Sequence, residues 1–140
     1  MDIQRWRTAV VVFCLNSVLA PFATAGEQTP QPYGRGVLAT FSIMACDLTN
    51  RQWGVVMQSR ILAIGSIVPF AREEVGAIAT QSWSNTTFGP RGLKMLSEGK
   101  PAQETLDSLL LNDAGHANRQ VAIIDRQGRI AHFTGEMCLN

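Results

Sequence analysis

Residues 40–59, TFSIMACDLTNRQWGVVMQS, carry the pattern that decides the fold. Side chains in the first part of this stretch alternate between two faces, which is the period of a β-strand. One face carries Phe41, Ile43 and Ala45, and the other carries Thr40, Ser42, Met44 and Cys46. Turn-forming residues follow at 47–51, and a second strand is expected over 52–59. The stretch therefore predicts an antiparallel hairpin whose first strand begins at Thr40.

The rest of the chain predicts further strands with a pair of helices between them. Pro90 and Pro101 suit the first turn of a helix, because a proline lacks the N–H that would have no partner there. The first helix is expected to end at Gly99, and a loop at 112–119 ends the second. The further expected strands are residues 61–71 (a short strand or an extended segment), 75–81, 120–124 and 129–133. Strands grouped in this way around a helix pair indicate the α+β class.

The N-terminal residues have the layout of a secretory signal peptide. Residues 1–25 combine a basic start at Arg5 and Arg7, an apolar run, and a cleavage site of small residues at 23–25. The apolar run is too short for a comfortable membrane span, so we expect no stable span after cleavage. Residues 26–36 are rich in Pro, Gln and Gly and are expected as a linker to a domain at 37–140. The prediction is an exported protein, periplasmic or extracellular.

Composition limits the class of partner and cofactor. The 140 residues suffice for one domain, and the formal net charge of +1 favours neither nucleic acid nor an anionic membrane as a partner. In an oxidising compartment Cys46 and Cys138 can pair or remain thiols, and the sequence leaves both outcomes open. Neither the cysteine spacing nor a nearby histidine suggests a metal site, and GPRG at 89–92 lacks the lysine and spacing of a phosphate-binding loop. No metal and no cofactor are therefore expected.

Several segments together resemble a bacterial family of unknown function. They are TFSIMACD, GVVMQSRILAIGSIVPFA, VGAIATQSWSNTTFGPRGLKMLSEG and RQVAIIDRQGRIAHFTG, and they run in the family's order from Thr40 onward. That family is placed in the superfamily of N-terminal nucleophile (Ntn) hydrolases, and the resemblance implies a four-layer αββα sandwich. Family members continue well beyond the FTG segment at 133–135, so the sandwich is expected to be incomplete. Either the chain is a truncated version, or a second copy of it covers the exposed sheet in a homo-oligomer.

The resemblance also implies a catalytic role for Thr40. Members of the superfamily cleave amide bonds with the first residue of the mature chain, whose side chain attacks and whose α-amine is the base. An α-amine has an ordinary pKa of about 7.7–8.0, so it can accept a hydroxyl proton at neutral pH. A second cut, between Ala39 and Thr40, is required, because an amide nitrogen has no proton affinity to spare. The alternative is that Thr40 is only the polar first residue of a strand.

Other polar residues are candidates for substrate binding. Gln58, Ser59 and Arg60 close the second predicted strand and would line a pocket at the sheet end; the alternative is a polar strand terminus. Asn85 lies in a loop dense in amides and hydroxyls and is the preferred oxyanion or substrate contact. The leading hypothesis is hydrolysis of an amide bond in an unknown small-molecule or peptide substrate. The competing hypothesis is a non-catalytic cell-envelope binding module on the same scaffold.

Overall fold

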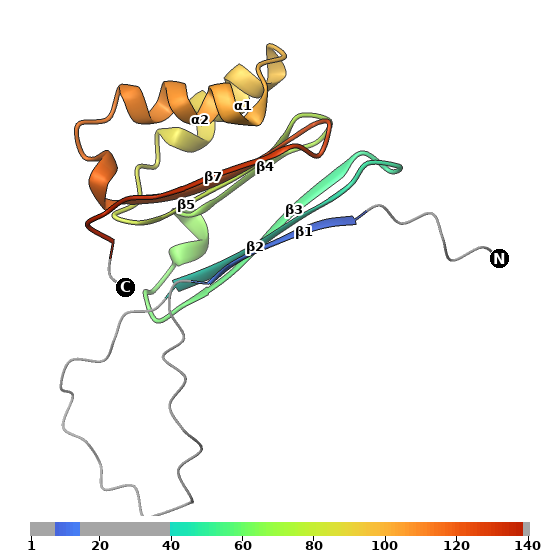
Figure 1. Ribbon diagram of the computed structural model, residues 1–140. Coiled ribbons are helices and arrows are strands. Elements are labelled where there is room, and N and C mark those ends of the chain that lie inside the picture. The colour runs from blue at the N-terminus through green and yellow to red at the C-terminus, as the bar shows by residue number, and fades with distance from the viewer. Residues whose placement is uncertain (1–7, 15–39, 139–140) are drawn as a thin grey trace, which may run out of the picture.

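The structure, a computed structural model, describes residues 8–14 and 40–138. In this part of the chain the strands form two antiparallel sheets, and two α-helices cover one face of the four-stranded sheet (Figure 1). The layers therefore run in the order helices, four-stranded sheet, three-stranded sheet. The α+β class predicted from the sequence is confirmed.

The three-stranded sheet contains the predicted hairpin. Strands β2 (Thr40–Asp47) and β3 (Gln52–Ser59) pair antiparallel, in the register that sets Thr40 opposite Ser59. In the turn between them, the Asp47 carboxylate accepts hydrogen bonds from two backbone N–H groups, at 2.9 and 3.1 Å. An aspartate that bonds the backbone just ahead of it stabilises such a turn. The hairpin prediction is therefore confirmed, including its first residue.

A third strand, β1 (Thr8–Cys14), pairs antiparallel with the other edge of β2. It comprises most of the apolar run that the sequence suggests as the core of the export signal. The same run of apolar and β-branched residues suits both roles. The other residues of the expected signal, and the linker at 26–36, lie outside the described residues. Export thus stays a prediction, and cleavage after Ala25 would remove β1 from the sheet.

The four-stranded sheet follows the order of its strands along the chain. These are β4 (Pro69–Arg72), β5 (Gly76–Ser82), β6 (Arg119–Asp125) and β7 (Ile130–Thr134). The last three lie where the sequence predicts strands. The expected strand at 61–71 is confirmed only at its end, because Ala63 takes a left-handed backbone (φ 57°) and a short 3₁₀ helix follows at Ile64–Ser66.

The two helices lie where the sequence places them. Helix α1 spans Phe88–Ser97, and helix α2 spans Ala102–Leu111. Pro90 falls in the first turn of α1, and Pro101 immediately precedes α2. Gly99 follows α1 with a φ of +95°, a conformation that glycine adopts without the strain other residues incur.

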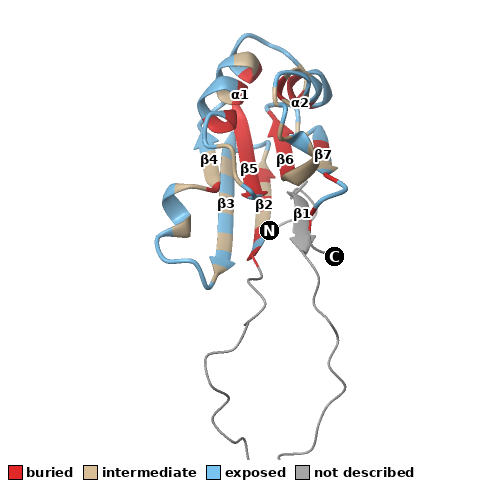
Figure 2. Cartoon of the chain, turned by 90° about the vertical axis from the view of Figure 1, so that its left-hand side faces the viewer, coloured by how far each residue is buried: buried red, intermediate tan, exposed pale blue. Residues whose placement is uncertain are grey.

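Two apolar layers hold the fold together. The layer between the helices and the four-stranded sheet contains the fully buried residues Ile78, Phe88, Leu106, Leu109 and Ile123. The layer between the sheets contains Met44, Val68, Ala77, Ala79, Ala122 and Ile124. Its alanines are small, which lets the sheets approach each other closely. Buried residues accordingly concentrate in β5 and β6, the central strands of the four-stranded sheet (Figure 2).

The outer face of the three-stranded sheet carries exposed apolar side chains. Phe41 and Val56 keep 39% and 66% of their surface exposed. Within residues 8–14 and 40–138, no helix covers this face (Figure 1). The described residues thus form three layers, and the fourth layer of an αββα sandwich stays an expectation.

Candidate functional site

Thr40 and Ser59 meet at one end of the layer between the sheets. They are register partners on β2 and β3, and their hydroxyl oxygens lie 2.9 Å apart, so that one donates to the other. The Ser59 oxygen also accepts a hydrogen bond from the Ile61 N–H at 3.1 Å. Thr40 keeps only 9% of its surface exposed. A hydroxyl pair therefore occupies the strand end where the sequence predicts the nucleophile.

Gln58 and Arg60 are not directed at the Thr40 hydroxyl. Gln58 lies opposite Phe41, and alternate residues of a strand point to opposite faces of the sheet. Its side chain is therefore exposed on the outer face. Arg60 follows the last residue of β3 and is also exposed. Of the three residues predicted to line a pocket here, the structure brings Ser59 to Thr40.

Asn85 belongs to a hydrogen-bond network in the loop before α1. Its side-chain oxygen accepts hydrogen bonds from the N–H and the hydroxyl of Thr87, at 3.1 and 2.7 Å. Its side chain also bonds Asp113, whose carboxylate accepts a hydrogen bond from Arg119 Nε at 2.6 Å. Arg119 in turn donates to the backbone carbonyl of Trp83. These contacts tie the loop to the start of β6, so Asn85 has a structural role in this arrangement.

The Asp113–Arg119 pair shifts the pKa of both partners. The hydrogen bond from Arg119 lowers the pKa of Asp113, although burial partly opposes this effect. The same bond raises the pKa of the Arg119 guanidinium. The side chains of Asp113 and Arg119 keep 10% and 18% of their surface exposed. Both groups stay charged at neutral pH, so the pair fixes the loop and does not exchange protons.

Two buried glutamines on neighbouring strands of the four-stranded sheet form a polar contact that the sequence did not predict. Gln81 and Gln120 are register partners on β5 and β6, and Gln81 Nε2 donates to Gln120 Oε1 at 2.5 Å. Ala79 and Ala122 on the same strands face the three-stranded sheet, and strand alternation turns both glutamines the same way. The signal in the sequence is a glutamine two residues away from an alanine on a buried strand, which places both on the same face.

The two sheets are aligned so that Thr40 and Gln120 lie at the same end of the molecule. At the other end, the Trp53 indole N–H donates to the Asp125 carbonyl at 3.2 Å, which joins the start of β3 to the end of β6. Thr40 is the residue of β2 farthest from that contact, and Gln120 lies near the opposite end of β6. In Figure 1 the start of β2 and the end of β7, the strand that pairs with β6, lie on the same side of the molecule.

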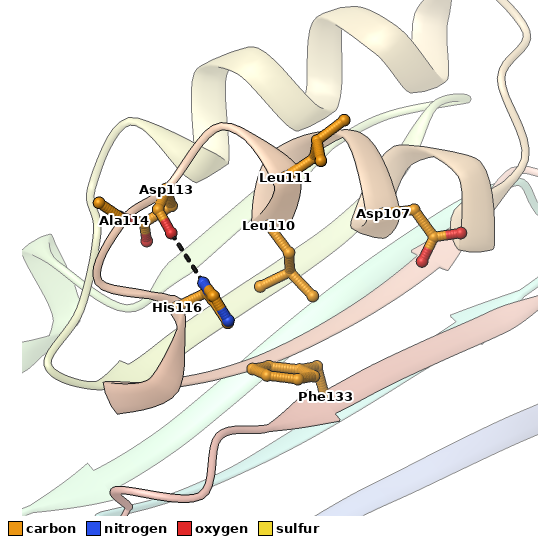
Figure 3. A pocket seen from close by; sticks show the side chains of 7 residues that line it. All are labelled: Asp107, Leu110, Leu111, Asp113, Ala114, His116 and Phe133. Carbon is orange, nitrogen blue, oxygen red and sulfur yellow. Dashed lines mark hydrogen bonds between the residues drawn. The ribbon is translucent and has the colours of Figure 1, made fainter.

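A hollow of about 560 Å³ lies between the end of α2 and β7 (Figure 3). Its lining consists of Asp107, Leu110, Leu111, Asp113, Ala114, His116 and Phe133. The ring N–H at His116 Nδ1 donates to the Asp113 carbonyl at 3.0 Å, and the ring centroids of His116 and Phe133 lie 6.3 Å apart. A second hollow, of about 330 Å³, also includes His116 and Phe133. Thr40 lines neither of them, but Thr134, which accepts a hydrogen bond from Gln120, lines the second.

The described residues contain neither a metal-binding cluster nor a disulfide. Among them, no group of three or more His, Cys, Asp and Glu side chains is placed to hold a metal ion. Cys46 and Cys138 are buried thiols and are not joined in a disulfide. The helices at 88–97 and 102–111 lack the length and apolar character needed to cross a membrane.

Comparison with known proteins relates the chain to a family. Residues 40–140 match the family described as "Family of unknown function (DUF1028)". Protein SPO2555 from Silicibacter pomeroyi, whose crystal structure is described under the same family, is 29% identical and gives a TM-score of 0.68. The match covers 72% of this chain and 45% of that chain, so this chain matches less than half the length of SPO2555. No curated protein matches the chain.

Proposed function

The chain belongs to the DUF1028 family of unknown function, and from this premise we propose that it is an amide hydrolase of the N-terminal nucleophile type. The proposed nucleophile is Thr40, on the αββα scaffold of that superfamily. The observation that carries the proposal is the position of Thr40. The family match begins at this residue, which heads β2 and directs its hydroxyl into the layer between the sheets.

Cleavage between Ala39 and Thr40 would create the catalytic base. In the uncut chain the Thr40 nitrogen belongs to an amide, whereas after the cut it is an α-amine with an ordinary pKa of about 7.7–8.0. This amine takes the hydroxyl proton as Thr40 Oγ1 attacks the carbonyl carbon of the substrate amide. It then gives the proton to the leaving nitrogen as the C–N bond breaks. Water hydrolyses the ester that remains on Thr40 and releases the acid.

Ser59 serves to position the nucleophile. Its oxygen accepts the Ile61 N–H at 3.1 Å, and its own proton is then available to Thr40 Oγ1 at 2.9 Å. A hydroxyl that donates to the attacking oxygen stabilises the negative charge that develops there as the proton leaves. Ser59 therefore holds Oγ1 in place and favours its ionised form.

The proposed substrate is an uncharacterised small molecule or peptide that contains an amide bond. The proposed compartment is the periplasm or the extracellular space, where a signal at residues 1–25 would deliver the protein. A second copy of the chain is the proposed cover for the outer face of the three-stranded sheet, where Phe41 and Val56 are exposed.

Covalent labelling tests the assignment of the nucleophile. A β-lactone probe acylates the hydroxyl of an N-terminal threonine, and peptide mapping by mass spectrometry locates the adduct. We expect an adduct on residue 40 in the wild-type protein and in Thr40→Ser, and none in Thr40→Ala. Thr86→Ala, which removes an exposed hydroxyl from the loop before α1, is the matched control and keeps the adduct. Folded wild-type protein that resists the probe would count against the proposal.

A non-catalytic binding module on the same scaffold is the second candidate. It is favoured by the fact that the Thr40 hydroxyl already has a partner in Ser59 and that Thr40 is buried, with 9% of its surface exposed. Cross-strand hydroxyl pairs of this kind also stabilise sheets without any catalytic role. This candidate predicts that Thr40→Ala lowers the free energy of unfolding by about 1 kcal/mol and changes nothing else. The labelling experiment separates the two candidates.

A further inference from the structure

We propose that the side chain of Gln81 is a ligand contact, whose carbonyl oxygen accepts a hydrogen bond from the N–H of a neutral amide. The inference deepens the proposed function, because it names a recognition contact for an amide substrate of Thr40. It stands on different atoms from the nucleophile assignment, and the experiment below distinguishes failure of one from failure of the other.

Gln81 ends a chain of hydrogen bonds that crosses the four-stranded sheet. Gln81 Nε2 donates to Gln120 Oε1 at 2.5 Å, and Gln120 Nε2 donates to Thr134 Oγ1 at 3.2 Å. In this chain of bonds the Gln81 carbonyl oxygen lies at the far end from Thr134. This oxygen is buried and has no hydrogen-bond partner among the described residues.

An open acceptor at this place costs stability. Gln81 and Gln120 keep only 2% and 3% of their surface exposed. A buried acceptor without a donor costs about 1–3 kcal/mol. Ala79 and Ala122, in phase on the same strands, show that this layer accommodates apolar residues. A costly polar group in a layer that does not require one is typical of a functional contact.

The unpaired carbonyl oxygen of Gln81 lies on the face of the sheet that is turned toward Thr40. Thr80 and Thr105 have buried hydroxyls without a partner among the described residues, but Thr80 lies on the alternate face of β5, toward the helices. Thr105 lies on α2, which is on the far side of the same sheet. Gln81 faces the layer between the sheets, at the end that holds the Thr40 hydroxyl.

The surroundings favour a neutral ligand group over a cation. The polar side chains that alternate into this end of the layer are hydroxyls and amides: Thr40, Ser42, Ser59, Gln81, Gln120 and Thr134. The carboxylates on the same strands, Asp47 and Asp125, lie at the opposite end, and Glu136, which lines the smaller hollow with Thr134, is exposed to water. A cation would lose its hydration here without a charged partner. The N–H of a carboxamide or peptide bond needs a single acceptor, which Gln81 supplies.

NMR of the side-chain amides in the ¹⁵N-labelled full-length protein tests the inference. N-methylacetamide, a neutral amide with one N–H donor, is titrated, and methylammonium chloride is the charged comparison. We expect a saturable shift of the Gln81 and Gln120 signals with N-methylacetamide and no saturable shift with methylammonium. Gln103, an exposed glutamine on α2, is the reference and follows only the linear solvent drift.

The variants separate the possible outcomes. Thr40→Ala retains the saturable shift whether or not Thr40 is a nucleophile, so loss of labelling alone leaves the Gln81 contact intact. Gln81→Met abolishes the shift of the Gln120 signal. If the wild-type Gln81 signal merely drifts in proportion to that of Gln103, or responds equally to methylammonium, the inference is overturned.

Replacing both glutamines together tests whether their side-chain amides bind a ligand or stabilise the fold. Gln81→Met/Gln120→Met removes both partners and the open oxygen together, and matched apolar replacement of a buried polar pair is nearly neutral or stabilising. We therefore expect a Tm at or above that of the parent, with no saturable shift of the remaining glutamine side-chain signals on addition of N-methylacetamide. A Tm several degrees lower would mean that the amides hold β5 to β6, and would refute a role in binding.

Discussion

Ser59 holds the Thr40 hydroxyl at 2.9 Å, and this contact links the stability of the sheet end to its proposed chemistry. Loss of one hydrogen bond costs about 1 kcal/mol in the folded state. If the same bond strengthens as Oγ1 becomes negative, its loss also raises the barrier to acylation. The two effects can be measured separately, because the hydroxyl of Ser84, which bonds the Thr80 carbonyl, contributes only to stability.

Ser59→Ala separates these effects. We expect a loss of about 1 kcal/mol in the free energy of unfolding and acylation of Thr40 slowed about tenfold, which corresponds to about 1.4 kcal/mol in the barrier. Ser84→Ala is the matched control, because the Ser84 hydroxyl donates to the Thr80 carbonyl at 2.8 Å. It should show a similar loss of stability with no change in acylation rate. Equal acylation rates in Ser59→Ala and the wild type would leave Ser59 without a positioning role.

The Asp113–Arg119 pair predicts how stability depends on pH. The pKa of Asp113 is lowered in the folded protein, chiefly by the hydrogen bond from Arg119. Its stabilisation is therefore fully present above the ordinary Asp pKa of about 3.9 and is lost as the pH falls through the lower pKa of the folded state. Urea unfolding should show Asp113→Asn less stable than the wild type by about 1.5–3 kcal/mol at neutral pH.

Measurements of unfolding at acidic pH provide the control for that prediction. The difference between Asp113→Asn and the wild type should narrow once the pH falls below about 4, because the wild-type carboxyl then becomes neutral as well. Asp107→Asn, on the exposed side of α2, should differ little from the wild type at any pH. A gap for Asp113→Asn that stays constant into strong acid would exclude the ion pair as its cause.

The sequence predicted only part of the candidate site. Thr40 and Ser59 were both identified, because they begin and close neighbouring strands of one hairpin. Gln58 was expected in the same pocket, but the alternation of side chains along β3 places it on the outer face with Phe41, and its role in binding stays a prediction. The Gln81–Gln120 contact depends on the register of strands 39 residues apart, which no local pattern reveals.

At the scale of elements, α1 packs closely on the four-stranded sheet through its glycines. A Cβ placed on Gly92 would overlap the Ile78 side chain, and one placed on Gly89 would overlap the Phe70 ring. In an exposed helix, Gly→Ala stabilises by about 1 kcal/mol. In a packed interface, an added methyl group costs about 1–3 kcal/mol. The sign of the change in unfolding free energy on Gly→Ala therefore reports how closely the helix approaches the sheet.

Gly92→Ala should therefore destabilise the protein despite the gain in helix propensity. We expect a lower Tm in thermal unfolding, because α1 and β5 cannot move apart to fit the methyl group without opening the apolar layer around Ile78. Lys94→Ala, on an exposed position of the same helix, should change the free energy of unfolding by less than about 0.5 kcal/mol. A Tm for Gly92→Ala at or above that of the wild type would contradict the close packing.

Local patterns predicted most elements and failed where one pattern allows two outcomes. The strands with clear alternation and the helices bounded by proline and glycine lie where the sequence places them. Residues 61–71 are mostly apolar, with interruptions at Gly65 and Pro69, and this pattern does not reveal that a 3₁₀ helix follows Ala63 before β4 begins. Residues 8–14 satisfy the requirements of a signal core and of an edge strand equally, so their sequence cannot choose between the two.

At the scale of the whole molecule, the outer face of the three-stranded sheet predicts self-association. Val56 is 66% exposed there, near the exposed Phe41. Sedimentation equilibrium should show a dimer that Val56→Lys converts to monomer, because a charge on this face would have to be buried in the contact. Thr86→Lys, on an exposed loop position, should leave the association unchanged. A wild-type protein that stays monomeric at high concentration would exclude this surface as the contact.

The central claim is that Thr40 becomes the first residue of the mature chain. Intact mass and N-terminal sequencing of the folded protein, isolated from cells that produce it, measure this directly. The amide hydrolase proposal predicts a chain that begins at Thr40, because only a free α-amine can take the hydroxyl proton. A folded chain that begins at Gly26, or at any other residue before Thr40, would contradict it.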